Sequence, residues 1–157
     1  MPTRIFIHGL ESSNKGTKSL FFREIFPDMI VPHFTGDLPE RMEKLETILS
    51  GKSDIRLVGS SFGGLMATLF TMEQAPRVKK MILLAPAINM LETSTHRNRK
   101  ISVPTDIYHG KNDGVIPLDQ VQNMAQKIFL NLSFHEVDDD HFLHKTFKTM
   151  DWEGLLR

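Results

Sequence analysis

A serine flanked by glycines is the residue pattern with the clearest chemical meaning. Residues 59–64 read GSSFGG, follow a short apolar segment over 54–58, and precede apolar residues at helical spacing. A strand that turns sharply into a helix leaves Ser61 at the apex, with its hydroxyl exposed above the sheet. Gly59 and Gly63 are expected there because a side chain would crowd the turn. The pattern indicates a serine nucleophile; a flexible strand-to-helix loop rich in glycine and serine is the alternative.

A serine hydroxyl needs a base that takes its proton and an acid that orients the base. In a strand–turn–helix site of this kind the chain order is serine, acid, histidine. Asp113 lies in the loop after a predicted strand over 102–109, so we expect it to be the acid, although Asn-Asp-Gly is also typical of turns. His141 follows a predicted strand over 132–137, so we expect it to be the base. The alternatives are that His141 is a surface histidine beside three aspartates, or that His144 is the base.

Two backbone N–H groups are expected to bind the negative oxygen that forms during acyl transfer. One should belong to Phe62, the residue after the serine, and the other to the loop after the first strand, over residues 3–7. We assign the second to Leu10, because Gly9 allows the backbone to come close and His8 is available to brace the loop. A simple strand-ending turn at these residues is the alternative.

Four stretches together resemble the α/β-hydrolase superfamily, and within it the small lidless bacterial esterase-like hydrolases. They occur in the order of that superfamily, cover nearly the full length, and span residues 7–13, 59–64, 109–117 and 140–142. The resemblance implies that Ser61 is the nucleophile, Asp113 the acid and His141 the base of a carboxylesterase-like serine hydrolase (EC 3.1). Two departures stand out. Asp140 replaces the glycine that often precedes the base, and the chain has room for about six strands where the superfamily has eight.

The order of the predicted elements favours a mainly parallel sheet, because strands and helices alternate along the chain. We expect a three-layer α/β sandwich with about six strands and helices on both faces, and with its site at the carboxyl ends of the strands. A final helix should begin at Phe142. The six expected strands lie near 3–7, 29–33, 54–58, 79–85, 102–109 and 132–137. The expected helices lie near 16–25, 39–50 and 62–70, and a further helix follows residue 117 and ends at about 127.

The length of 157 residues predicts one domain over 1–157. The segment 86–101 is the longest irregular stretch, and its sixteen residues are too few for a cap domain of several helices. Its polar, basic half over 91–100 suits either a short flap over the site or a solvated loop.

Composition narrows the classes of partner. Nineteen basic and nineteen acidic residues cancel, so no net field favours nucleic acid or an anionic membrane. Without cysteine there is no disulfide and no thiolate metal site. The Asp138–His141 cluster is a weak candidate for a cation, and residues 9–19 do not have the spacing of a phosphate-binding loop. We expect no cofactor, no secretory signal and a cytoplasmic location.

The sequence thus predicts a serine hydrolase that cleaves a small carboxylic ester or thioester through an acyl-enzyme on Ser61, with a small acyl compound as its substrate and neither nucleic acid nor membrane as a partner. Two alternatives stay open. The first alternative is a binding or scaffold protein on a hydrolase fold. The second is a transferase or lyase that uses the same three side chains.

Overall fold

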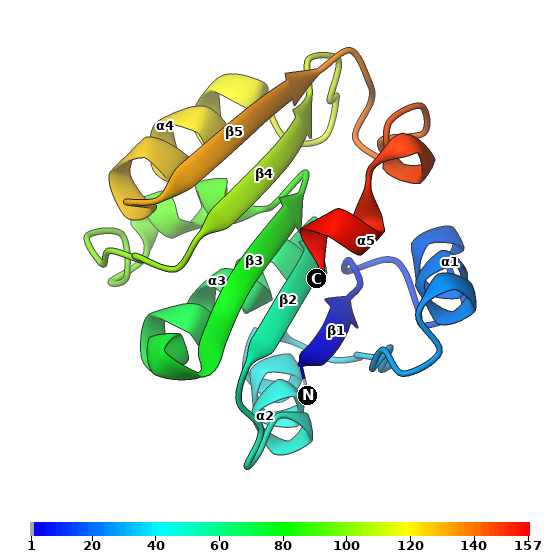
Figure 1. The fold of residues 1–157 in the computed structure, drawn as a ribbon. Helices are drawn as coiled ribbons and strands as arrows, with labels where there is room; N and C mark the ends of the chain where they lie inside the picture. The colour runs from blue at the N-terminus through cyan, green and yellow to red at the C-terminus, as the bar shows by residue number, and fades with distance from the viewer. Residues whose placement is uncertain (1) are drawn as a thin grey trace.

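A five-stranded, fully parallel sheet forms the centre of the molecule in the computed structural model, which describes residues 2–157. The strands lie side by side in chain order, each hydrogen-bonded to the next. Their carboxyl ends therefore share one edge of the sheet (Figure 1). The strands are β1 (Thr3–Ile7), β2 (Ile55–Ser60), β3 (Val78–Leu84), β4 (Thr105–Gly110) and β5 (Leu132–Val137).

Helices cover both faces of this sheet (Figure 1). One face carries α2 (Leu38–Ile48), α3 (Phe62–Gln74) and α4 (Leu118–Ile128), and the other carries α1 (Thr17–Ile25) and α5 (Trp152–Leu155). Crossovers between parallel strands are right-handed, so strands added in one direction place their helices on one face. The three-layer α/β prediction is confirmed. Short 3₁₀ turns also occur, at η1 (Ala75–Arg77), η2 (Ile88–Thr93) and η3 (Phe147–Thr149).

Two apolar clusters, one on each face, hold the layers together. Strand β1 shows how the sequence divides them: Ile5 and Ile7 belong to the cluster under α2, α3 and α4, whereas Phe6 belongs to the cluster under α1 and α5. This is the period of two expected of a strand buried on both sides. On the second face Phe22 and Trp152 meet edge to face, with ring centroids 4.8 Å apart.

The segment near 29–33 does not form the expected sixth strand. Only Ile30 pairs with β1, where its N–H donates to Arg4 O at 2.9 Å and its carbonyl accepts from Phe6 N–H at 3.0 Å. Pro27 lies just before the segment and Pro32 lies within it, and a proline has no N–H to extend a ladder. The pairing therefore stops at a single bridge.

The helix expected from Phe142 is also absent, and turns occupy residues 141–146 before η3. Leu143 has a left-handed backbone, with φ of 54°, which a helix cannot continue through. The carboxylates of Asp139 and Asp140 accept N–H groups from this segment, including those of Lys145 and Thr146. These side-chain acceptors take the place of helical carbonyls.

The segment 86–101 divides into two halves. Its first half contains η2, in which Ile88 and Leu91 are buried, and its second half is mostly exposed turns. The buried half packs against α4, which ties the start of the segment to the body of the molecule. No helix in residues 2–157 is both long enough and apolar enough to cross a membrane.

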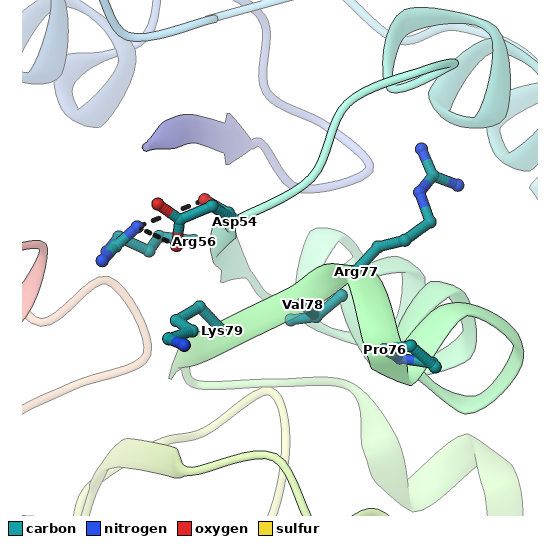
Figure 2. Close-up of a pocket in the computed structure, with 6 residues that line it drawn as sticks. All are labelled: Asp54, Arg56, Pro76, Arg77, Val78 and Lys79. Atoms are coloured by element: carbon teal, nitrogen blue, oxygen red, sulfur yellow. Dashed lines mark hydrogen bonds and ion pairs between the residues drawn. The ribbon is translucent and has the colours of Figure 1, made fainter. Parts of the chain in front are cut away.

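At the amino ends of β2 and β3 lies a hollow of about 320 Å³ bordered by charged side chains (Figure 2). Arg56 donates to Asp54 Oδ1 at 2.8 Å and to the carbonyl oxygen of Arg157 at 2.8 Å. Arg77 donates to the carbonyls of Lys52, at 2.9 Å, and Leu49. These guanidinium groups are thus already engaged by acceptors of the protein itself.

Candidate active site

The turn between β2 and α3 places Ser61 at the carboxyl edge of the sheet. Ser61 has φ of 56° and ψ of −117°, a conformation that costs energy for a residue with a side chain. Backbone hydrogen bonds hold it. Its N–H donates to Leu84 O at 2.9 Å, and its carbonyl accepts from the N–H groups of Gly64 and Ala87, each at 2.9 Å. The end of β3 and the loop after it therefore fix the strained residue.

The glycines on either side of Ser61 have steric reasons to be glycine. A Cβ at Gly63 would overlap the carbonyl oxygen of Ile7 and lie 2.7 Å from that of His8. A Cβ at Gly59 would lie 2.8 Å from Cα of Gly64. Both positions are places where one backbone passes directly against another, as the sequence predicts for the turn.

His141 lies between the two other side chains that the sequence selected. Ser61 Oγ lies 3.1 Å from His141 Nε2, and His141 Nδ1–H donates to Asp113 Oδ2 at 2.7 Å. The carboxylate accepts only, so Nδ1 carries the hydrogen and Nε2 offers a lone pair to the serine hydroxyl. The structure brings all three residues together from the ends of β2, β4 and β5. In this arrangement Nε2 is able to take a proton from Ser61.

Asp113 is held by its own turn and has no exposed side-chain surface. Its Oδ1 accepts from the N–H groups of Val115 and Ile116, both at 2.8 Å, which is the geometry of an Asx turn. The turn and the acid role proposed for Asp113 are therefore compatible. Oδ2 is left to face His141 and a second imidazole, that of His109.

The second imidazole is a residue that the sequence analysis did not single out. His109 Nε2–H donates to Ile116 O at 2.9 Å and lies 3.2 Å from Asp113 Oδ2. Its Nδ1 is buried and has no partner among residues 2–157. Burial lowers the pKa of His109, although the nearby carboxylate opposes this shift. A neutral ring with its hydrogen on Nε2 provides the hydrogen bond to Ile116 O and leaves Nδ1 as a buried lone pair without a charge.

The rival histidine points elsewhere. His144 is 71% exposed and its Nδ1 lies 2.6 Å from Asp140 Oδ2. Asp139 is buried, and although burial opposes it, hydrogen bonds from Thr146 and other loop groups hold its pKa below the usual range. Asp138 accepts from Asn112. The three aspartates thus have separate partners, and residues 2–157 contain no group of three metal-ligating side chains placed to hold an ion.

The loop after β1 lies against Ser61. A Cβ at Gly9 would come 3.4 Å from Cβ of Ser61, so this glycine marks a close approach. His8 Nδ1–H donates to Gly9 O at 2.7 Å, and His8 Nε2 accepts from Phe34 N–H at 2.9 Å. In a planar trans peptide the carbonyl of residue 9 and the N–H of Leu10 point in opposite directions. His8 therefore sets the direction of the Leu10 N–H.

The two expected oxyanion donors are free of protein acceptors. No hydrogen bond within residues 2–157 uses the N–H of Leu10 or that of Phe62. Phe62 opens α3, and the first N–H groups of a helix lack acceptors and carry partial positive charge.

A cavity of about 770 Å³ opens over these groups. Four apolar side chains around it, those of Leu10, Met90, Val115 and Phe142, are each more than half exposed. Lys18 also borders the cavity, where its Nζ donates to Phe142 O at 2.7 Å. The cavity thus combines an apolar mouth with a polar floor at Ser61 and His141, which is usual for a small-molecule site.

Comparison with known proteins gives the same fold. A hydrolase from Agrobacterium vitis S4 superimposes with a TM-score of 0.80 at 18% identity, over 99% of this chain and 88% of the other. A YdeN-like hydrolase from Pectobacterium atrosepticum superimposes with a TM-score of 0.76 at 23% identity, over 99% of this chain and 87% of the other. The protein Est1E from Butyrivibrio proteoclasticus, solved with ferulic acid, superimposes with a TM-score of 0.75 at 15% identity, over 95% of this chain and 84% of the other. A search of curated protein sequences found no match.

The sequence model of the dienelactone hydrolase family matches residues 5–139, which include the last three residues of β1 and all the strands after it. This range covers most of the chain and agrees with the expected α/β-hydrolase resemblance. The family supports a hydrolytic function. The chain belongs to the dienelactone hydrolase family.

Proposed function

We propose that this protein is a serine hydrolase that cleaves a carboxylic ester or thioester through an acyl-enzyme on Ser61. The observation that carries the proposal is the position of His141, whose two ring nitrogens lie 3.1 Å from Ser61 Oγ and 2.7 Å from Asp113 Oδ2. A serine is activated by such an arrangement, because the base removes its proton as the bond to carbon forms.

The proposed reaction has two halves. Ser61 Oγ attacks the acyl carbon while its proton moves to His141 Nε2, and Asp113 stabilises the resulting imidazolium. The N–H groups of Leu10 and Phe62 bind the oxyanion. The C–O or C–S bond then breaks, and the leaving group takes the proton from His141. In the second half water attacks the acyl carbon and gives a proton to His141 Nε2. His141 then returns that proton to Ser61 Oγ as the acyl–oxygen bond breaks, which releases the acid and regenerates the serine.

The cavity suggests the kind of substrate. Four exposed apolar side chains at the opening suit an apolar acyl or alcohol group, and the open mouth suits an ester that protrudes from a small molecule. None of these steps draws on a metal or an organic cofactor.

The test is hydrolysis of a series of p-nitrophenyl esters of increasing acyl length by the wild type and Ser61→Ala, with fluorophosphonate labelling in parallel. Turnover and labelling should both be lost in Ser61→Ala, and the trend with acyl length measures the pocket. A folded wild type that is not labelled would refute the proposal and leave a binding protein on a hydrolase fold. Added alcohol or amine that captures the acyl group in place of water would instead indicate a transferase.

A further inference from the structure

Arg41, on the first turns of α2, is a buried charge whose surroundings need an explanation. The residue is only 4% exposed. Its Nε donates to Gly36 O at 2.8 Å and one terminal nitrogen donates to Leu10 O at 3.3 Å. The other terminal nitrogen is buried and has no partner among residues 2–157. No carboxylate in that range forms an ion pair with it.

A buried cation of this kind is costly. A charge removed from water normally acquires a counter-ion, and a buried charge without one is strongly destabilising. Burial accordingly lowers the pKa of Arg41, although a guanidinium stays protonated at neutral pH. A neutral side chain of similar length would fill the same space at less cost. The charge therefore calls for a role other than packing.

The contacts of Arg41 lead to both expected oxyanion donors. Its hydrogen bond to Leu10 O fixes the peptide that follows Leu10, while His8 fixes the peptide before it through Gly9 O. Leu10 is thus held from both sides. The guanidinium carbon also lies 5.5 Å from the ring centroid of Phe62, within range of a cation–π contact.

We propose that Arg41 is a positioning residue of the oxyanion site, which holds Leu10 and Phe62 together and places an unpaired positive charge beside both. The inference rests on the function proposed above. An oxyanion forms only in the transition state, so a charge preorganised near it favours that state over the bound substrate. The role predicts an effect on kcat with little effect on KM.

The experiment compares Arg41→Met and Arg41→Lys with Lys44→Met as the matched control. Lys44 lies one turn further along α2 and has contacts of the same two kinds, a backbone carbonyl (His33) and an aromatic ring (Phe34), but none to the oxyanion loop. Each variant is titrated with fluorophosphonate, so that kcat is expressed per active serine. Thermal melting reports the folded fraction separately.

Arg41→Met should lower kcat per titrated site by about 10- to 100-fold with KM within about twofold, the size of effect expected when catalytic groups are misplaced. Arg41→Lys keeps the charge but not the planar guanidinium, so its kcat per titrated site should lie between that of Arg41→Met and that of the wild type. Lys44→Met should match the wild type. A Met variant with wild-type kcat per site, or a control with the same loss, would overturn the proposal. If Arg41→Met does not fold, Arg41→Lys alone tests the proposal: a lowered kcat per titrated site supports it, and a wild-type kcat overturns it. An unlabelled wild type would instead refute the serine-hydrolase proposal.

Discussion

The two ends of the sheet both contain charged and polar side chains, but they differ in whether those side chains have all their hydrogen-bond partners. At the amino ends of β2 and β3, Arg56 donates to the carboxylate of Asp54 (Figure 2), and Arg77 donates to backbone carbonyls. At the carboxyl ends, Arg41 and His109 each keep one buried nitrogen that has no partner among residues 2–157. Ser61 adds a strained backbone there.

This difference separates stability from chemistry. Groups whose hydrogen bonds are complete gain nothing more from a ligand, so we assign the amino end a role in stability. Buried groups with spare capacity cost folding energy, and proteins retain such costs mainly at functional sites. We therefore expect substitutions at the two ends to act on different measurements.

The largest effect should come from the carboxyl end. His141→Ala removes the only imidazole that contacts Ser61 within residues 2–157, so kcat should fall by at least about 10⁴-fold. His144→Ala, which removes a largely exposed ring paired with Asp140, should change kcat by less than about threefold. Steady-state kinetics on the ester that the wild type prefers measure both. A large loss in the His144 variant alone would reverse the assignment of the base.

Gly63→Ala should destabilise the fold by at least about 3 kcal/mol, because the new methyl group would overlap the backbone oxygen of Ile7 at the end of β1 and crowd that of His8. The loss should appear even though alanine is the better helix former. Gly114→Ala is the control, since a Cβ there meets no atom within 4 Å. Urea unfolding followed by circular dichroism measures both. Equal stability of the two variants would mean that the turn has room that the structure does not show.

Acid should weaken the fold through the two buried histidines beside the site. Burial lowers the pKa of both His8 and His109 below the unfolded value of 6.5. The unfolded chain then binds more protons than the folded one below pH 6.5, so the free energy of unfolding falls as pH drops through that value. Each ring contributes a slope of up to about 1.4 kcal/mol per pH unit.

Urea unfolding of the wild type and His109→Phe between pH 7.5 and 5 tests this dependence. The variant should have a shallower slope, because one of the two titrating rings is gone. A slope identical to that of the wild type would show that His109 is protonated equally in the folded and unfolded states.

The smallest effect should come from the amino end. Arg56→Met removes the hydrogen bonds to Asp54 and to the carbonyl of Arg157, and should cost about 1 kcal/mol of stability. Values of kcat and KM should not change, because these groups lie at the opposite edge of the sheet from Ser61. A drop in kcat per titrated serine would break the division between the two ends.

Local sequence patterns predicted most of the fold and singled out three side chains that the structure brings together. The glycines around Ser61, the turn at Asp113 and the strand before His141 are each encoded within a few residues, so periodicity and turn chemistry were enough to find them. The same patterns overestimated order where tertiary contacts decide. The prolines around Ile30 limit its pairing to one bridge, and side-chain acceptors at Asp139 replace a helical start.

The supporting residues could not be predicted in this way. Arg41 occurs in a helix of mixed charge and looks like any exposed arginine until α2 packs against the loop at Leu10. His109 lies in a strand, and its relation to Asp113 depends on how the next loop folds back over the end of β4. Contacts between distant segments leave no local signature, so only the structure reveals them.

The hydrogen bond from Ser61 N–H to Leu84 O has a consequence for folding. Apart from local hydrogen bonds such as that from Gly64 N–H, the strained turn is secured by the end of β3 and by the loop that follows it, so its backbone hydrogen bonds to Leu84 and Ala87 are missing before β3 docks beside β2. A nascent or partly unfolded chain would thus contain the serine but not the reactive geometry. Enzymatic activity would then report, during refolding, the moment at which the two central strands join.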